Sequence, residues 1–261
     1  MKAFVLAAGM GTRLKPVTET TPKALVPVRG VAMLDRIAGV LVRGGATSLA
    51  LNVHHLPQAV ERHLSSRGGV GYFPAYPSLP VHLFFEEVLL GTGGGLLNAA
   101  SFWGVAPLLV WNADILADID PAALMADHLR NPDALATLVV SGRSATSQLL
   151  FDAEGTLCGI ASQRRNDHRT VRQPHGEIIP RAFHGISVLS PRLRAEMNRR
   201  HPSGGPFDLI DALLDAASHG GLVRLYDAGT TFWGSTGSPS EFAHLEKALE
   251  ANPSLLARWA P

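Results

Sequence analysis

Residues 3–14 read Ala3-Phe4-Val5-Leu6-Ala7-Ala8-Gly9-Met10-Gly11-Thr12-Arg13-Leu14. The first six of them form a continuous apolar run without alternation, which is typical of a β-strand buried on both faces of a parallel sheet. Glycines follow directly at the carboxyl end of that strand, and in open α/β sheets this end faces the ligand crevice. The stretch therefore predicts an α/β fold with a binding loop after its first strand.

The loop that follows the strand carries groups suited to phosphate. Gly9 and Gly11 lack side chains, so backbone N–H groups can approach an anion closely. Arg13 adds a forked donor for phosphate oxygens. Lys23, which follows Pro22 and precedes apolar residues, adds a mobile point charge. Together these residues predict a cradle for the phosphates of a nucleoside triphosphate.

Two other glycine motifs fit this loop worse. The dinucleotide-binding fingerprint requires a third glycine where Leu14 stands. The P-loop requires a lysine directly after its second glycine, and Gly11 is followed by Thr12 and Arg13. The sequence therefore favours neither of these classes.

Strands and helices alternate over the first half of the chain, which is the pattern of a doubly wound α/β sheet. We expect strands over 3–8, 48–53, 81–86 and 108–111, and helices over 32–42, 57–63, 95–101 and 121–129. After about residue 134 we expect mainly strands, over 134–141, 147–152, 157–161 and 183–189, with helices again over 206–219 and 238–251. The polar segment 163–180, rich in Arg and His, is expected to be a mobile loop or lid.

Length and composition set the class of protein. With 261 residues, 46% of them hydrophobic and 17% charged, the chain can fold around one large α/β core. A formal net charge of +1 argues against non-specific nucleic-acid binding, and no stretch approaches the length that crosses a bilayer. The single cysteine, Cys158, is expected to be a small core residue in a reducing compartment. We therefore expect a cytoplasmic protein with neither nucleic-acid nor membrane partners, and leave its oligomeric state open.

The glycine loop, taken together with Pro22-Lys23, resembles the signature of the sugar-1-phosphate nucleotidylyltransferases, which carry Gly-x-Gly-Thr-Arg-Leu followed by Pro-Lys. The resemblance extends to Asn52-Val53-His54-His55-Leu56, Leu90-Gly91-Thr92-Gly93-Gly94-Gly95 and Phe183-His184-Gly185-Ile186. It implies a Rossmann-like, mostly parallel sheet flanked by helices, of the nucleotide-diphospho-sugar transferase type. It also implies a single domain, with a nucleotide-binding half over 1–133 and a sugar-phosphate-binding half over 134–261.

The same resemblance implies roles for individual residues. Arg13 and Lys23 would be catalytic, because they would stabilise the triphosphate. The backbone of the glycine loop and of the second glycine segment would hold the nucleotide, at Leu6, Ala8, Gly9, Gly11, Thr12 and Gly91. Gly185 and Trp233 would lie at the sugar phosphate.

A metal site is expected at Asp114, which follows the strand over 108–111. A carboxylate at the carboxyl edge of a strand is well placed to hold Mg²⁺, and the position matches the first metal aspartate of the family. The second metal aspartate is missing, because Trp233-Gly234-Ser235-Thr236-Gly237-Ser238-Pro239 has Ser235 where the family has Asp. Asp227 is a candidate substitute, and Mg²⁺ can also be held by one carboxylate and several waters.

The sugar side departs from the family as well. Many relatives carry a Glu-Lys-Pro segment whose lysine binds the sugar phosphate, and here the region reads Ala161-Ser162-Gln163-Arg164-Arg165-Asn166. Arg164 or Arg165 is a candidate phosphate clamp, and a solvated basic loop is the alternative. Glu86 has two open interpretations, a contact with base or ribose and a strand-end carboxylate facing water.

The leading hypothesis is an enzyme that transfers a nucleoside monophosphate from a nucleoside triphosphate to a sugar 1-phosphate, with Mg²⁺ as cofactor. The compact length and the triple glycine resemble the N-acetylmuramate-1-phosphate uridylyltransferases and the heptose-phosphate guanylyltransferases within that family. A regulatory protein that binds nucleotide sugars and has lost turnover through Ser235 is one alternative. A cytidylyltransferase acting on a non-sugar phosphate is another.

Overall fold

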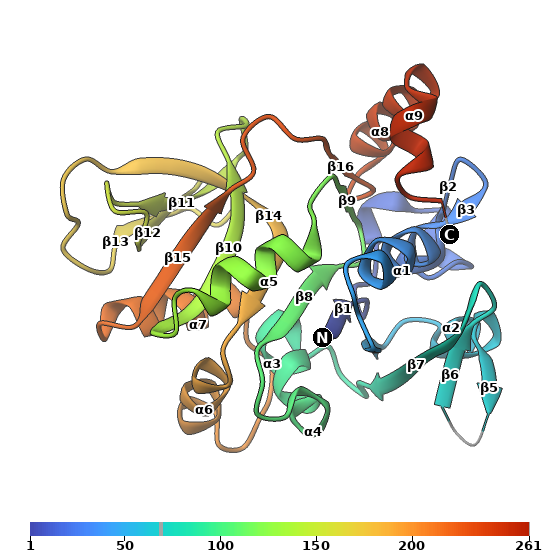
Figure 1. The fold of residues 1–261 in the computed structure, drawn as a ribbon, viewed down its shortest axis with the longest axis horizontal. Coiled ribbons are helices and arrows are strands. Elements are labelled where there is room, and N and C mark those ends of the chain that lie inside the picture. The colour runs from blue at the N-terminus through green and yellow to red at the C-terminus, as the bar shows by residue number, and fades with distance from the viewer. Residues whose placement is uncertain (68–69, 261) are drawn as a thin grey trace. The chain divides into compact units, whose positions relative to one another are not determined.

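The computed structural model describes residues 1–67 and 70–260. The chain divides into two compact units, each assembled from separate stretches (Figure 1). Unit 1 consists of Met1–Leu89, Val110–Ala122 and Phe232–Pro261, and unit 2 of Leu90–Leu109 and Ala123–Thr231. Each unit therefore combines segments from both predicted halves of the chain.

Unit 1 is built on a sheet in which the strands lie in the order β8–β1–β4–β7–β6–β5. The strands are β1 (Lys2–Leu6), β4 (Ser48–Val53), β5 (Ser65–Arg67), β6 (Val70–Phe73), β7 (Tyr76–Phe85) and β8 (Leu108–Asn112). β1 pairs with β4 and β4 with β7 in parallel, whereas β7, β6 and β5 pair antiparallel. Phe4, Leu49 and Leu51 are fully buried in this sheet, as expected for strands covered on both faces.

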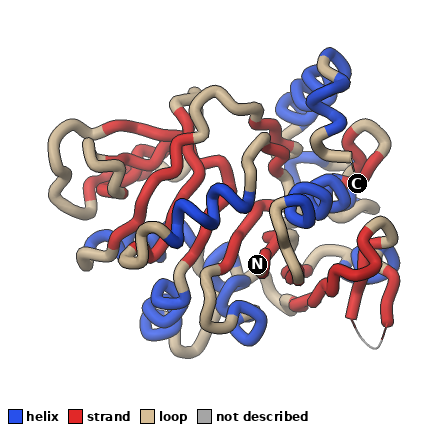
Figure 2. Tube along the Cα trace, viewed as in Figure 1, coloured by secondary structure: helices blue, strands red, loops and turns tan. Residues whose placement is uncertain are grey.

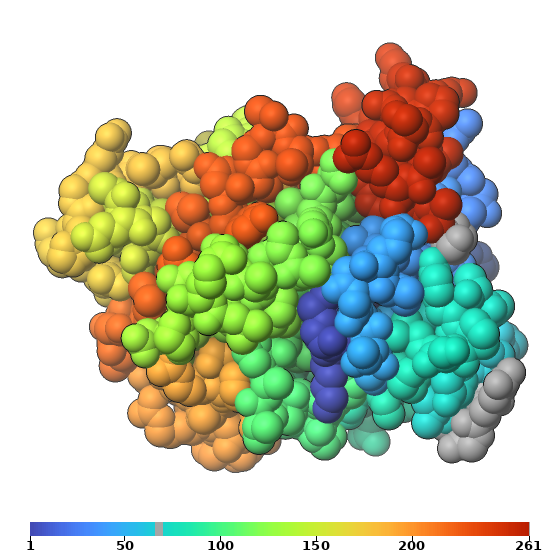
Figure 3. All heavy atoms as spheres, in the orientation of Figure 1, coloured from blue at the N-terminus to red at the C-terminus, as the bar shows by residue number. Residues whose placement is uncertain are grey.

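Helices and short strands complete unit 1 (Figure 2). They are η1 (Thr12–Leu14), η2 (Val17–Glu19), η3 (Lys23–Leu25), β2 (Pro27–Val28), β3 (Val31–Ala32), α1 (Met33–Arg43), α2 (Pro57–His63), β9 (Ile115–Ala117), β16 (Trp233–Ser235), α8 (Pro239–Ala251) and α9 (Pro253–Ala257). The C-terminal helices lie against the N-terminal part of the chain (Figure 3). Buried Arg36 on α1 links β2 to the segment after α9, because its guanidinium donates to Val28 O (2.7 Å) and to Trp259 O (3.1 Å).

Unit 2 has its own mainly antiparallel strands. They are β10 (Ala134–Ser141), β11 (Ser147–Phe151), β12 (Leu157–Ser162), β13 (Asp167–Thr170), β14 (Ile179–Leu189) and β15 (Leu222–Asp227). The order β13–β12–β11–β14 is antiparallel throughout, β14 continues antiparallel to β10, and β10 pairs in parallel with β15. Its helices are α3 (Gly91–Asn98), α4 (Ala100–Trp103), α5 (Pro121–Leu129), α6 (Pro191–Arg200) and α7 (Leu209–Ser218). Cys158 is buried in β12, as expected.

Most predicted elements are confirmed. The bounds of β4, β10 and α2 agree with the prediction to the residue, and those of α1, β11 and α8 to within one residue. Strong apolar periodicity and clear helix starts, such as Pro57 at the first turn of α2, explain this agreement. The structure contains no helix, among the residues that it describes, long and apolar enough to cross a membrane.

Two predictions are corrected. The segment 163–180 is not one loop, because β13 pairs with β12 around a turn in which Asn166 has a φ of 48°. The helix expected over 95–101 begins already at Gly91, so the triple glycine lies inside its first turns. Glycine disfavours helix, but Phe207 O accepts hydrogen bonds from Gly93 N (3.0 Å) and Gly94 N (3.3 Å) and so holds this turn from outside the helix.

Two buried histidines make the stability of unit 2 dependent on pH. His128 on α5 and His184 on β14 are hydrogen-bonded to Thr137 Oγ1 and Ser141 Oγ, each at 2.9 Å. Burial lowers the pKa of each from 6.5 to about 4. Between these values the unfolded chain binds a proton that the folded chain does not, so the free energy of unfolding falls as pH is lowered from about 6.5 towards 4.

We expect a loss of about 1.4 kcal/mol per pH unit and per histidine in that window, and a constant contribution above it. Urea unfolding at pH 7 and pH 5 measures it. His128→Asn should reduce the pH dependence, whereas His244→Asn, at an exposed histidine, should leave it unchanged. The same pH dependence in all three proteins would contradict the assignment.

Candidate functional site

The first turn after β1 is held by a series of hydrogen bonds between buried polar groups. Ala7 N donates to Asn52 Oδ1 (2.8 Å), and Asn52 Nδ2 donates to Glu86 Oε1 (2.7 Å). Asn52 and Glu86 are both buried, and the Glu86 backbone carbonyl also meets His54 Nδ1 at 2.8 Å. Glu86 is therefore a support of the turn in this structure rather than a carboxylate facing water. Buried polar groups that are mutually satisfied hold one geometry.

The glycine turn itself leaves its amides open. Within residues 1–67 and 70–260, no group accepts a hydrogen bond from the backbone N–H groups of Ala8, Gly9, Met10 or Gly11. A Cβ atom on Gly9 would have no heavy atom within 4 Å, so the space in front of this residue is empty. Unpaired amides that border open space form the kind of concavity that binds anions.

Gly11 has a different role from Gly9. Its φ is 62°, and a Cβ atom there would lie 2.7 Å from Thr18 Cγ2 and 3.3 Å from Lys23 Cβ. Thr18 Oγ1 donates to Gly11 O (2.8 Å), which closes the loop. The absence of a side chain at Gly11 thus lets the chain return and brings Lys23 beside the glycine turn.

Lys23 and Asp114, predicted from separate motifs, form an ion pair in which Lys23 Nζ meets Asp114 Oδ2. Their side chains are only 16% and 21% exposed. Asp114 lies in the turn between β8 and β9, which Trp111 holds by donating from Nε1 to Ile115 O (2.9 Å). Ala113 N donates to Leu6 O (3.1 Å), so this turn also adjoins the end of β1.

Ser235 lies next to this turn through the pairing of β16 with β9, in which it is opposite Ile115. Thr236 N donates to Asp114 O (2.9 Å). Buried Ser235 accepts a hydrogen bond from Gly237 N (2.8 Å) and donates to Glu241 Oε2 (3.2 Å). The position of the missing aspartate therefore holds a hydroxyl that is paired with a neighbouring carboxylate.

Arg13 approaches the same place. A Cβ atom on Gly237 would lie 2.6 Å from Glu241 Oε2, 2.8 Å from Ser235 Oγ and 3.2 Å from Arg13 Nη2. Sequence reasoning missed Glu241. Its signal was the spacing Ser238-x-x-Glu241 at the start of α8, a capping-box pattern in which Glu241 N donates to Ser238 Oγ (3.3 Å).

The remaining predicted residues divide between the units. Trp233 lies on β16 in unit 1, whereas Gly91, Gly185, Arg164 and Arg165 belong to unit 2. Gly185 interrupts β14 with a φ of 76°, and Gly91 begins α3. Asp227, the candidate substitute ligand, ends β15 in unit 2, 4.0 Å from Arg181 Nε.

Arg165 has a protein partner in this structure. Its Nη2 lies 2.5 Å from Asp211 Oδ2, and this hydrogen bond raises the pKa of the guanidinium. Arg164 is exposed in the turn between β12 and β13. Of the two candidate clamps, Arg164 is the one whose charge is not already matched by a carboxylate among the described residues.

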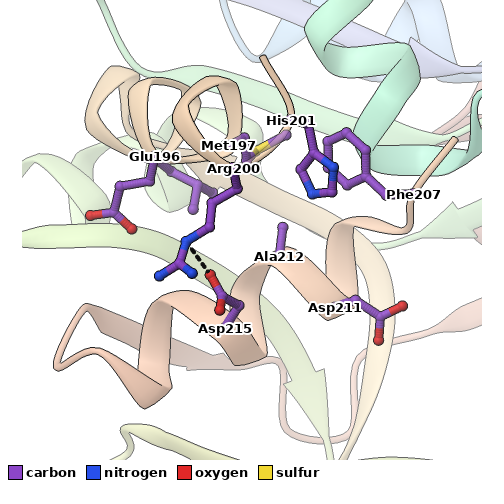
Figure 4. A pocket seen from close by; sticks show the side chains of 9 residues that line it. Glu196, Met197, Arg200, His201, Phe207, Asp211, Ala212 and Asp215 are labelled. Atoms are coloured by element: carbon purple, nitrogen blue, oxygen red, sulfur yellow. Dashed lines mark ion pairs between the residues drawn. The ribbon is translucent and has the colours of Figure 1, made fainter. Parts of the chain in front are cut away.

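Unit 2 also contains a cavity of about 320 Å³ between α6 and α7 (Figure 4). It is lined by Leu193, Glu196, Met197, Arg200, His201, Phe207, Asp211, Ala212 and Asp215. Arg200 Nε and Asp215 Oδ2 form an ion pair at 2.9 Å across its edge. None of the predicted site residues lines this cavity.

The donor set around Asp114 fits Mg²⁺. Among the described residues, no three His, Cys, Asp or Glu side chains lie close enough together to hold a metal ion between them. Mg²⁺ typically takes one or two carboxylates, several waters and substrate phosphates. Asp114 supplies one carboxylate, and Glu241 supplies another beside Ser235, whose neighbour Thr236 donates from its N–H to Asp114 O.

The comparisons with known proteins identify the family of the chain. The family model "Nucleotidyl transferase" matches residues 2–148. An N-acetylmuramate alpha-1-phosphate uridylyltransferase of Caulobacter vibrioides is 30% identical over 247 residues, with 91% of this chain and 92% of the relative covered. A mannose-1-phosphate guanyltransferase of Aspergillus fumigatus is 27% identical, with 98% of this chain and 68% of the relative covered.

Solved structures share the fold at lower identity. A UDP-glucose pyrophosphorylase from Acinetobacter baumanii superposes with a TM-score of 0.75 at 16% identity, covering 97% of this chain and 95% of that one. The chain belongs to the nucleotidyl transferase family, and within it to the sugar-1-phosphate nucleotidylyltransferases. The predicted family and fold class are confirmed.

The two glycines of the turn should respond differently to a methyl group. Gly11→Ala forces a side chain into the left-handed region and against Thr18, so we expect a loss of about 1–3 kcal/mol in the free energy of unfolding. Gly9→Ala meets open space and should change it by less than about 0.5 kcal/mol. Urea unfolding of both variants measures the difference, and equal losses would contradict the assigned roles.

Proposed function

We propose that the chain binds a nucleoside triphosphate in the glycine turn and transfers its nucleoside monophosphate to a sugar 1-phosphate, releasing pyrophosphate. The observation that carries the proposal is that the backbone N–H groups of residues 8–11 have no acceptor among the described residues, with empty space in front of Gly9 and with Lys23 and Arg13 close by. A polyphosphate supplies the acceptors and the negative charge that this arrangement lacks.

The chemistry requires positioning and charge neutralisation. A phosphate oxygen of the sugar 1-phosphate attacks the α-phosphorus, a new P–O bond forms, and the bond to the leaving pyrophosphate breaks. Backbone amides, Arg13 and Lys23 would balance the charge that accumulates on the leaving group. Asp114 would hold Mg²⁺, which supplies Lewis-acid stabilisation of phosphate oxygens when bound. In the ion pair, the positive charge of Lys23 balances the negative charge of the Asp114 carboxylate.

For the substrate pair we propose UTP and N-acetylmuramate 1-phosphate. Two relatives at 30% identity, from Caulobacter vibrioides and Neisseria meningitidis, bear the name of N-acetylmuramate alpha-1-phosphate uridylyltransferase. The chain also matches mannose-1-phosphate guanyltransferases at lower identity, so GTP with mannose 1-phosphate is the second pair. In unit 2, Gly185 and Arg164 are proposed to contact the sugar phosphate, as the family resemblance implies.

A Mg²⁺-dependent pyrophosphate-release assay that crosses the common triphosphates with a panel of sugar and polyol phosphates tests the function. The matched variant is Gly9→Ala, whose methyl group enters the proposed phosphate space without disturbing the fold. We expect it to weaken triphosphate binding about tenfold or more. Gly142→Ala, another glycine with no neighbour around its Cβ position, should bind like the wild type.

Turnover with one pair and weaker binding in Gly9→Ala alone is the expected result. Calorimetric binding of nucleotide sugars without turnover would instead support the regulatory alternative. Wild-type affinity in Gly9→Ala would contradict the assignment of the phosphate site.

Ser235→Asp tests the metal site without relying on activity. The new carboxylate would stand beside Glu241, whose Oε2 now accepts a hydrogen bond from Ser235 at 3.2 Å, and two adjacent carboxylates repel unless a cation joins them. We expect the apparent affinity for Mn²⁺, measured by calorimetry, to rise on the order of tenfold. Without metal the variant should be less stable, and adding Glu241→Gln should restore that stability.

Glu241→Gln alone serves as the matched control and should lower the metal affinity of the protein if Glu241 contributes. Unchanged Mn²⁺ binding in all three variants would show that position 235 and its neighbour are outside the metal site.

A further inference from the structure

The carboxyl end of β4 and the two residues after it contact the chain on both sides of the glycine turn. On the side of β1, Asn52 Oδ1 accepts a hydrogen bond from Ala7 N (2.8 Å). On the far side, the half-buried ring of His55 lies with its Nε2 atom 2.7 Å from Thr18 O. Residues 52–55 therefore hold both the chain that enters the turn and the chain that leaves it. All of these residues belong to unit 1.

Thr18 connects His55 to the glycine turn. Thr18 is only 1% exposed, and its Oγ1 donates to Gly11 O (2.8 Å). Leu14 N donates to the same carbonyl oxygen (2.8 Å), so the orientation of this peptide group is fixed by two hydrogen bonds. The Cβ position of Gly11 lies 2.7 Å from Thr18 Cγ2, which leaves Thr18 no room to move closer. A shift of Thr18 would therefore shift Gly11 as well.

The acceptors identify which ring nitrogen of each histidine carries a proton. A backbone carbonyl oxygen only accepts, so His55 donates from Nε2 to Thr18 O. By the same argument His54 donates from Nδ1 to Glu86 O (2.8 Å). The two adjacent histidines thus use different ring nitrogens. The contact of His55 requires a side chain whose donor lies at the far end of the ring.

The backbone directly after the two histidines is strained. Leu56 has a φ of 50° and a ψ of 49°, in the left-handed region that a leucine rarely adopts. It precedes Pro57, the first residue of α2. Such a conformation persists where surrounding contacts determine it. The hydrogen bonds of His54 and His55 are contacts of this kind, so His55 is a donor of fixed position.

We propose that His55 is a positioning residue for the polyphosphate site. By holding Thr18 it fixes Gly11, and with Gly11 the orientation of the backbone N–H groups in the glycine turn. The inference rests on the proposed function, because the polyphosphate in the turn is part of it. Without the His55 donor, the buried Thr18 would lose a hydrogen bond and the end of the turn would loosen. Donors that are no longer oriented in advance bind an anion more weakly.

The test uses inorganic tripolyphosphate with Mg²⁺, a phosphate chain without base or sugar, and calorimetry as the readout. His55→Phe keeps a ring and removes the donor, so we expect binding to weaken about fivefold, as for the loss of one hydrogen bond. In His55→Gln the amide nitrogen reaches as far as Nε2, and affinity should stay within about twofold of the wild type. The shorter His55→Asn should behave like His55→Phe.

A double-mutant cycle tests whether His55 acts through Thr18. Thr18→Val removes the hydroxyl that donates to Gly11 O and keeps the shape of the side chain. If the two residues act in series, the variant with both His55→Phe and Thr18→Val should lose about as much affinity as His55→Phe alone. Losses that multiply in the double variant would show that the two side chains act independently, and would overturn the positioning role.

His63→Phe is the matched control. His63 on α2 also makes a 2.7 Å contact, with Asp35 Oδ1 on α1, in the same unit but away from the glycine turn. We expect this variant to lower the Tm and to bind tripolyphosphate like the wild type. Equal losses of affinity in His63→Phe and His55→Phe would overturn the positioning role, because they would reflect stability alone.

The ring protons of the wild-type protein give a readout independent of the variants. ¹⁵N NMR should show a proton on Nε2 of His55, and a proton on Nδ1 alone would overturn the inference. Unchanged tripolyphosphate affinity in folded His55→Phe would also overturn it and leave the proposed function intact. A wild-type protein that binds no tripolyphosphate would instead overturn the phosphate site itself, so the two failures are distinguishable.

Discussion

The candidate site depends on the ion pair between Lys23 and Asp114. It joins the 3₁₀ helix η3 to the turn between β8 and β9, across 91 positions of sequence. Both side chains are largely removed from water, so either charge left alone there would be costly. The pair therefore keeps the return of the chain after Gly11 beside the end of β1. Because other contacts hold the shape of the glycine turn, its backbone N–H groups are available to a ligand.

Two buried side chains, Asn52 and Glu86, stabilise the glycine turn in a similar way. Their hydrogen bonds hold Ala7, two residues before Gly9, in place. A rigid support under an open loop is what pre-organised anion binding requires, since the donors are then already oriented when the ligand arrives. The empty space at Gly9 and the filled space at Gly11 show the same principle within three residues.

Where the sequence departs from the family pattern, the charged side chains and their partners differ locally. Ser235 replaces an expected carboxylate, and Glu241 brings another one within 3.2 Å of its hydroxyl. Arg165, one of the two candidate phosphate clamps, forms an ion pair with Asp211. In α3, glycines that resemble a base-proximal turn are required by Phe207 and by Gly205 O. Residues of a motif can thus be kept for reasons of packing as well as for ligand binding.

The sequence by itself determined the α/β class, most element bounds, the family and the glycine turn with Lys23, because apolar periodicity and short motifs are local properties of the chain. It could not show that Lys23 meets Asp114, that Glu86 is a buried support, that Glu241 stands beside Ser235, or that Phe207 holds α3. Three of these contacts join residues that are tens of positions or more apart, and the pairing of β16 with β9 is what brings Ser235 and Glu241 to the turn of Asp114. Only tertiary structure decides such contacts, since burial and strand pairing select which distant polar groups must satisfy one another.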